Sequence, residues 1–194
     1  HVGNWTINAS SSVGVGGSFD IEVIYGAIGS VILTANVTEI TADESVDFTV
    51  IRVDIRGNSN DITDTLSLSE WSALNGTFTE VDSRVIWTAW SKGTQWIEVE
   101  IEGETDRVTI SVVDGAPVEM DLRVTGGFSQ AFAGEILNLR AFVIDQRGNQ
   151  KPVTPENWLI TTPGADQSWV VLDGAAANFY AYTEGDWTVQ AALT

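Results

Sequence analysis

The stretch Asp54-Ile55-Arg56-Gly57-Asn58 decides the fold, because the chain repeats it as Asp145-Gln146-Arg147-Gly148-Asn149. The same offset of 91 residues relates Ala42-Asp43-Glu44 to Ala133-Gly134-Glu135, so this part of the two copies aligns without a gap. The motif follows a long apolar run in each copy, and its Gly, Asn and Asp residues are typical of tight turns between strands. The repeat therefore predicts two copies of one structural unit in tandem.

Around these motifs the sequence alternates apolar and polar residues with a period of two, as half-buried strands do. Phe19–Val23 alternates strictly, and so do Trp96–Ile101 and Trp187–Ala191. The strand-like runs are rich in Val, Ile, Thr and aromatic residues, and helical periodicity is almost absent. We therefore expect an all-β protein made of antiparallel β-sandwiches.

Two Gly-Ala pairs, Gly26-Ala27 and Gly115-Ala116, mark the junctions between units, because each follows an alternating strand. We expect residues 28–115 to form the first repeat and residues 116–194 the second, which would lack its final strand. Residues 1–27 would be the last two strands of a preceding repeat, or strands added to the first sandwich.

The tryptophans support this division. Gly3-Asn4-Trp5-Thr6-Ile7 reads like Gly185-Asp186-Trp187-Thr188-Val189. We expect one structural position to be shared by Trp5, Trp96 and Trp187, and another by Trp71 and Trp158. Aromatic residues that recur in each copy are better explained by a common core than by a ligand site. We further expect the strand 19–25 to lie beside the first sandwich or to be donated to a neighbouring molecule's second unit.

These motifs resemble the Ig-like repeat domains of bacterial and archaeal surface proteins, among them the invasin/intimin-like repeats. The resemblance covers residues 116–194 well and 28–115 more loosely, since Asp43 stands where the family usually has Gly. It rests on Ala116-Pro117, Ala133-Gly134-Glu135, Asp145–Asn149, the Trp158 strand and Gly185–Ala191. The resemblance implies tandem immunoglobulin-like antiparallel β-sandwiches that serve as stalks, adhesins, enzyme accessories or envelope components.

Composition excludes several function classes. The 194 residues include 27 acidic and 9 basic side chains, for a net charge of −18, which disfavours nucleic acid and anionic membranes as partners. No apolar run reaches the roughly 20 residues of a membrane helix. Without cysteine, and with His1 as the one histidine, the chain lacks the residues for thiol catalysis, zinc knuckles or a dependable Ser-His-Asp triad. We therefore expect no enzymatic activity, no catalytic residues and no cofactor.

Few residues remain as candidates for a binding site. Trp169 has no counterpart in the other repeat, so it is the aromatic residue that we single out for ligand contact. Asp61 with Asp64, and Glu80 with Asp82, place acids close together on expected loops, which leaves structural calcium as an alternative to a solvated acidic surface. Four Asn-x-Ser/Thr sequons suggest N-glycosylation of an exported protein, at Asn4, Asn8, Asn36 and Asn75.

We expect a non-enzymatic, extracellular segment of a larger surface or secreted protein, serving as a spacer or adhesive stalk. Its partners would be the neighbouring Ig-like repeats. Two alternatives remain: a carbohydrate-binding accessory module of a secreted enzyme, and a strand-donating subunit of an extracellular filament or envelope layer.

Overall fold

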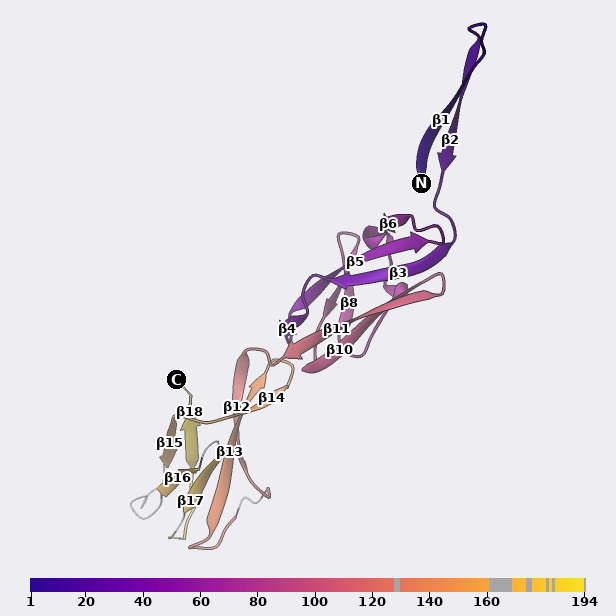
Figure 1. The fold of residues 1–194 in the computed structure, drawn as a ribbon. Coiled ribbons are helices and arrows are strands. Elements are labelled where there is room, and N and C mark those ends of the chain that lie inside the picture. The colour runs from indigo at the N-terminus through magenta and orange to yellow at the C-terminus, as the bar shows by residue number, and fades with distance from the viewer. Residues whose placement is uncertain (128–129, 161–168, 174–175, 181, 183, 194) are drawn as a thin grey trace. The chain divides into compact units, whose positions relative to one another are not determined.

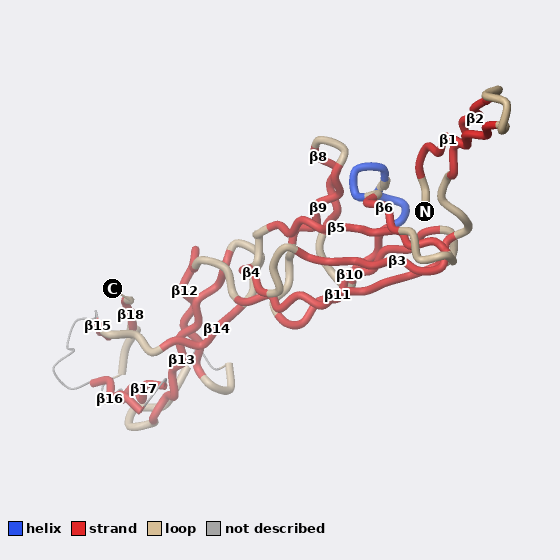
Figure 2. Tube along the Cα trace, turned by 45° about the horizontal axis from the view of Figure 1, so that its top comes forward, coloured by secondary structure: helices blue, strands red, loops and turns tan. Residues whose placement is uncertain are grey.

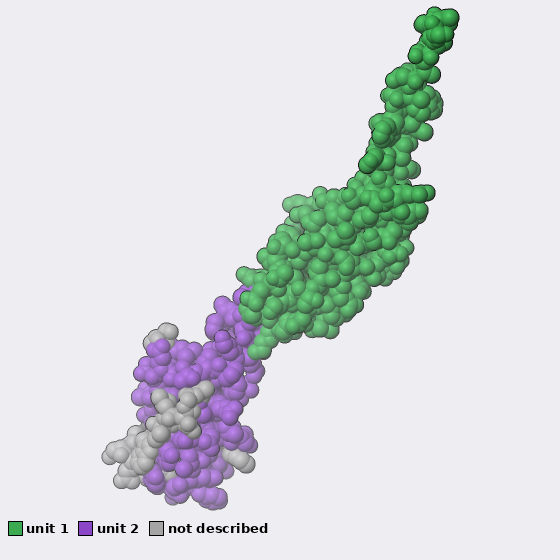
Figure 3. All heavy atoms as spheres, viewed as in Figure 1, with its two compact units in different colours: residues 1–40, 44–113 green, residues 41–43, 114–194 purple. Residues whose placement is uncertain are grey.

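In the computed structural model of the protein, the regular secondary structure consists almost entirely of β-strands (Figure 1). It describes residues 1–127, 130–160, 169–173, 176–180, 182 and 184–193, with the strand 169–173 given by its backbone alone. The chain divides into two compact units, coloured separately in Figure 3. Unit 1 comprises residues 1–40 and 44–113, and unit 2 comprises residues 41–43 and 114–194. The all-β prediction is confirmed.

Unit 1 contains an antiparallel sandwich of two sheets. The first has the strand order β3-β5-β9-β8, with β6 also paired to β5, and the second has the order β4-β11-β10-β7. The first order, and the β11-β10-β7 part of the second, are those of the two sheets of an immunoglobulin-type sandwich, and β4 is added at the edge of the second sheet. Two short 3-10 helices, η1 (Thr63–Thr65) and η2 (Leu68–Glu70), precede β7 and are blue in Figure 2. The strands are β3 (Ile28–Ala35), β4 (Glu39–Thr41), β5 (Ser45–Asp54), β6 (Ser59–Asp61), β7 (Trp71–Ala73), β8 (Thr77–Val81), β9 (Arg84–Thr88), β10 (Gly93–Ile101) and β11 (Glu104–Val113).

The core of this sandwich follows from the alternation of the sequence, since every second residue of a strand faces the opposite sheet. Its largest fully buried side chains come from both sheets: Trp87, Ile97, Ile110, Val46, Val50 and Val99. The indole Nε1 of Trp87 donates a hydrogen bond of 2.8 Å to the carbonyl oxygen of Asn75. Gly76, with φ of 104°, leaves room for this ring, because a Cβ there would lie 2.2 Å from the indole nitrogen.

Unit 2 repeats the first sheet of unit 1, in the order β12-β13-β17-β16, with β14 also paired to β13. Its second sheet consists of β15 and β18 in the part of the chain that the structure describes. The core contains Leu139, Ala177 and Phe179, against which Trp158 and Trp187 pack. The strands are β12 (Pro117–Val124), β13 (Ile136–Asp145), β14 (Gln150–Val153), β15 (Asn157–Ile160), β16 (Trp169–Asp173), β17 (Ala176–Tyr180) and β18 (Val189–Ala192).

Residues 1–25 contain a β-hairpin. Strands β1 (Gly3–Ser10) and β2 (Gly16–Val23) pair along their full length, with Trp5 opposite Ile21 and Ile7 opposite Phe19. All residues of both strands are exposed. The hairpin is a two-stranded sheet of its own in the described structure.

The prediction that Trp96 shares one position with Trp5 and Trp187 is wrong. In β10 the buried residues are Gln95, Ile97 and Val99, so Trp96 points to the opposite face, where the guanidinium of Arg107 lies 4.3 Å from its ring centre. Trp187 instead packs on the core, with its ring centre 5.9 Å from that of Phe179. Matching Trp96 with Trp187 requires one extra residue to be inserted before Trp96. In a strand, a shift of one residue turns the side chains to the other face.

The prediction that Trp71 and Trp158 share a position is confirmed. Trp71 of β7 lies opposite Val99 of β10, and Trp158 of β15 lies opposite Ala191 of β18. Both indole nitrogens are buried, and neither has a hydrogen-bond partner. The two rings therefore serve as apolar bulk between the sheets of their own sandwich.

Candidate functional site

The repeated Asp-x-Arg-Gly-Asn motif forms the same tight turn in both units. After β5, the Asp54 N–H donates to the carbonyl of Asn58 at 2.9 Å, and the Gly57 N–H donates to the carbonyl of Asp54 at 2.9 Å. Gly57 has φ of 81°, a conformation that favours glycine, which explains the Gly of the motif. The turn thus fixes the position of the Asp54 carboxylate at the end of the strand.

The Asp54 carboxylate accepts hydrogen bonds on both oxygens. Oδ1 accepts the backbone N–H groups of Arg56 and Asn58, each at 2.9 Å. Oδ2 accepts the Asn58 side-chain amide at 2.9 Å and, from the segment that enters the sandwich, the Gly26 N–H at 3.1 Å. The residue is only 4% exposed. One buried carboxylate therefore joins the turn to a segment 28 residues earlier in the chain.

Further hydrogen bonds hold this entering segment. The Tyr25 hydroxyl donates to the carbonyl of Ser59 at 3.0 Å, and the Arg52 guanidinium donates to the carbonyl of Gly26 at 2.9 Å. The Ile55 N–H donates to the carbonyl of Ala27 at 3.0 Å. We call the turn, its carboxylate and the Gly N–H that it accepts the linker clasp.

Unit 2 contains a second linker clasp with the same bonds. Asp145 Oδ1 accepts the N–H groups of Arg147 and Asn149, each at 2.9 Å. Asp145 Oδ2 accepts the Asn149 side-chain amide at 2.9 Å and the Gly115 N–H at 3.0 Å. Gly148, with φ of 80°, stands where Gly57 stands in unit 1. Asp145 is as deeply buried as Asp54, at 4% exposure.

Both clasp carboxylates are held in their ionised form. The Asn58 side-chain amide, with the backbone N–H groups around it, lowers the pKa of Asp54 well below its usual range against the opposing effect of burial. Burial acts to raise the pKa of Asp145, but the hydrogen bonds from Asn149, Gly115 and Arg147 outweigh it and lower this pKa as well. The negative charge of each carboxylate is therefore stabilised by the N–H groups that donate to it.

Sequence reasoning identified the turn motif and the Gly-Ala junctions separately but did not connect them. The signal that could have joined them was their common recurrence, with Gly26 before Asp54 and Gly115 before Asp145 at similar spacing. The N–H that completes each clasp belongs to the backbone, and a sequence does not reveal which backbone group a carboxylate binds.

The acids singled out for calcium are placed as follows. Asp61 Oδ1 accepts hydrogen bonds from the N–H of Thr63 at 3.0 Å and from its hydroxyl at 2.6 Å, so this carboxylate is bound to the first residue of η1. Asp64 pairs with Arg84 at 3.1 Å. Glu80 and Asp82 are exposed at the β8–β9 hairpin. Among the described residues, no three acidic or histidine side chains converge as a metal site would require.

The remaining predicted site residues belong to several different elements. Asn4 and Asn8 lie on β1, Asn36 follows β3, and Asn75 precedes β8; all four are exposed. Trp169 begins β16, opposite Tyr180, but its side chain lies outside the described residues. The hydrogen bonds of the two clasp carboxylates involve none of the four sequon asparagines.

A surface hollow with a volume of about 490 Å³ lies beside β7 and β10. Trp71, Glu70, Glu98 and Glu102 are among the residues that line it. Glu98 pairs with Arg107 at 2.7 Å, and Glu70 accepts the N–H and hydroxyl of Ser67. These carboxylates are therefore engaged in structural contacts.

No helix among the described residues is both long and apolar enough to cross a membrane.

Comparisons with known proteins find likeness in structure only. The sequence matches no protein-family model and no curated protein. Among solved structures, the chain is similar to the Escherichia coli adhesin FdeC, with 13% identity, a TM-score of 0.43, and coverage of 84% of this chain and 60% of that one. For the Yersinia pseudotuberculosis adhesin InvE the identity is 15%, the TM-score 0.37, and the coverage 78% and 51%.

The surface layer protein SbsC is similar over 100% of this chain and 34% of its own, with 12% identity and a TM-score of 0.36. The chain thus spans between about a third and three fifths of these three structures.

Proposed function

We propose that this chain is a non-enzymatic segment of a larger extracellular surface protein, in which Ig-like units act as spacers. The observation that carries the proposal is the linker clasp, which occurs in both units with the same atoms. Each unit binds, through Asp54 or Asp145, the backbone of the segment that leads into it. A unit that holds its own entering segment is suited to be added in series.

The chemistry of the clasp supports a mechanical role. The carboxylate accepts a hydrogen bond from a backbone group, the Gly N–H. The bond therefore tolerates changes in neighbouring side chains. Hydrogen bonds to an ionised carboxylate are about twice as strong as neutral ones. In unit 1 the bonds from Tyr25, Arg52 and Ile55 hold the same segment at further points. The segment is therefore fastened to the sandwich rather than left as a free tether.

The surface suits a location outside the cell. A net charge of −18 maintains solubility in salt, and the four exposed sequons offer acceptor sites on an exported chain. Treatment of the protein from its native source with a glycan-removing enzyme tests this point. A loss of mass at Asn4, Asn8, Asn36 or Asn75 supports export, and unmodified peptides at all four positions argue against it.

Small-angle scattering of the purified chain at low concentration tests the spacer role. We expect the dimensions of an extended molecule, and a single compact globule would contradict a spacer. Replacement of both clasp carboxylates, in Asp54→Asn with Asp145→Asn, should broaden the distribution of dimensions while the circular dichroism of the sandwiches persists. A glycan array provides the second readout, since saturable binding of a sugar would instead favour a carbohydrate-binding module.

A further inference from the structure

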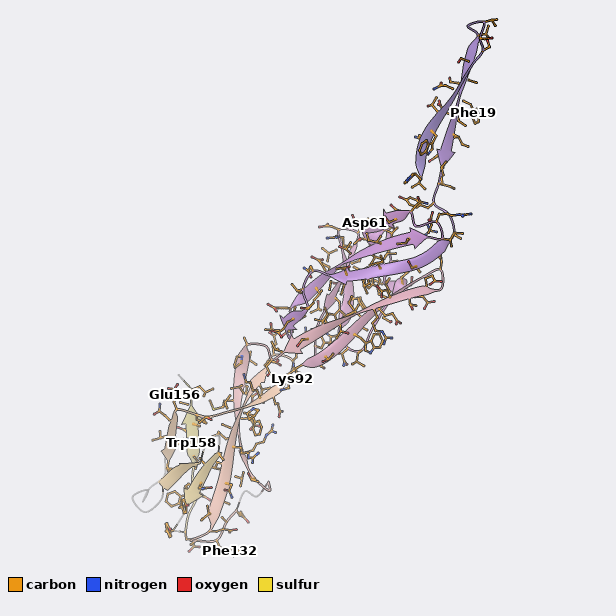
Figure 4. The ribbon with its side chains drawn as sticks, viewed as in Figure 1. Phe19, Asp61, Lys92, Phe132, Glu156 and Trp158 are labelled. Atoms are coloured by element: carbon orange, nitrogen blue, oxygen red, sulfur yellow. The ribbon has the colours of Figure 1, made fainter. Side chains whose placement is uncertain are left out.

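The β1–β2 hairpin has one apolar and one polar face. Register and alternation place five large apolar residues on one side: Trp5, Ile7, Phe19, Ile21 and Val23. All are exposed, Trp5 to 48% and Phe19 to 66% (Phe19 is labelled in Figure 4). The opposite face carries Thr6 and Asp20, joined by a hydrogen bond of 2.7 Å. A contiguous exposed apolar face of this kind marks an interaction surface.

The hairpin has the same design as β10–β11 of unit 1. Gly3 lies opposite Val23 as Gly93 lies opposite Val112, and Ile7 lies opposite Phe19 as Ile97 lies opposite Val108. Ile97 is fully buried and Val112 nearly so, because β11 packs over β3 of the facing sheet. The apolar face of β1–β2 is therefore the kind of surface that the inner side of an Ig-like sheet covers.

Unit 2 contains an inner sheet surface that is only partly covered. In unit 1, Val31 and Leu33 of β3 are 6% and 5% exposed. Met120 and Leu122 of β12 occupy the corresponding positions, since β12 pairs with β13 through the same bulge and register as β3 with β5. Both are only half-buried. In the described part of unit 2, β18 pairs with β15 alone, and its other edge carries no strand comparable to β11.

We propose that the β1–β2 hairpin of one molecule docks its apolar face on the inner side of β12 in unit 2 of a second copy of this chain. Both surfaces are apolar, and each resembles one half of a contact that unit 1 makes internally. Docking buries no charged group on either side. Asp20 and Glu22 lie on the far face of the hairpin, and Asp121 pairs with Arg123 on the outer face of β12.

The two docking surfaces differ from each other, so the contact is heterologous. Each molecule carries one hairpin and one β12 surface, and both can be engaged at once by different neighbours. Such contacts build rings when the rotation closes and fibres when it does not. The hairpin keeps its own β1–β2 pairing throughout, which avoids the loss of hydrogen bonds that donation of β2 alone would require.

Cysteine cross-linking tests this contact without interference, because the natural chain contains no cysteine. One sample carries Ile21→Cys on the apolar face of β2, and a second carries Leu122→Cys on the inner side of β12. The two are mixed, oxidised and analysed by mass. The matched control replaces Ile21→Cys by Asp20→Cys, the neighbouring residue on the polar face of the same strand.

We expect a disulfide-linked dimer of one Ile21→Cys chain with one Leu122→Cys chain, and at least about tenfold less of it with Asp20→Cys, as for loss of a central interface contact. Two results would overturn the proposal. One is equal cross-linking of the two hairpin variants. The other is a dimer that forms from Ile21→Cys alone, which would show hairpins that pair with one another.

Light scattering on the natural chain gives an independent readout. We expect the average mass to rise with protein concentration and to fall to that of a monomer in Phe19→Ser, whose exposed site leaves both sandwiches intact. A natural chain that stays monomeric at all concentrations would contradict the docking.

Discussion

The β1–β2 and β10–β11 hairpins share register and alternation but differ in what covers them. In β10–β11, Ile97 and Ile110 are fully buried beneath the facing sheet. Their counterparts Ile7 and Ile21 are exposed to 58% and 42%. The difference shows that alternation and a tight turn suffice to specify a hairpin, whereas the stability of its strands comes from a second sheet. Substitutions at matched positions can test this view.

The largest effect is expected at Trp87, the largest fully buried side chain of unit 1. Trp87→Ala should lower the free energy of unfolding of unit 1 by about 3–5 kcal/mol, because it leaves a cavity and frees the Asn75 carbonyl. Trp5→Ala in the hairpin should change it by less than about 0.5 kcal/mol. Denaturant unfolding monitored by circular dichroism measures both, and equal losses would contradict the comparison.

Gly76→Ala tests the packing around the Trp87 ring by adding a methyl group beside it. The new Cβ would lie 2.2 Å from the Trp87 indole nitrogen, and φ of 104° is unfavourable for alanine. We expect a loss of about 2–3 kcal/mol in unit 1, as for strained backbone with a displaced neighbour. Gly103→Ala is the control, since it has φ of 90° but no atom within 4 Å of the added Cβ. A smaller loss at Gly76 than at Gly103 would show that the ring moves freely.

The matched pair Ile110→Val and Ile21→Val compares the two hairpins directly. Removing one methylene from the buried Ile110 should cost about 0.5–1.5 kcal/mol. The same change at the exposed Ile21 should leave the thermal unfolding of dilute protein unchanged. Should Ile21→Val be as costly as Ile110→Val, the hairpin face must be covered within its own molecule.

The two clasp carboxylates should make the stability of the fold depend on pH in the acidic range. Because folding lowers the pKa of Asp54 and Asp145, each adds stability that is fully present above the unfolded value, about 3.9. This contribution is lost as the pH falls below about 4 towards the folded values. Asp54→Asn should therefore be less stable than the natural chain at pH 7 and less sensitive to acid.

Thermal unfolding between pH 7 and pH 2 measures this, with the exposed Glu80→Gln as control. If the stability of Asp54→Asn depended on pH as that of the natural chain does, the ionised Asp54 carboxylate would not contribute to the stability of the fold. We expect this to be the smallest of the four effects, because the other bonds of the entering segment remain.

The sequence was informative where local chemistry decides. Alternation predicted the strands, and Asp54–Asn58 with Asp145–Asn149 predicted the turns. It failed at Trp96, because a single-residue offset changes the face of a strand while leaving the composition of the stretch unchanged. The contacts of Asp54 with Gly26 and the partly covered surface of β12 depend on residues distant in the chain, which a single sequence does not relate.

Hydrogen exchange of the backbone amides at low protein concentration tests the central claim most directly, because it compares the two hairpins in one molecule. We predict slow exchange for the paired amides of residues 93–113 and fast exchange for those of residues 3–23. Protection of residues 3–23 should appear only as the concentration rises and copies associate. Equal protection of the two hairpins in dilute protein would contradict the account.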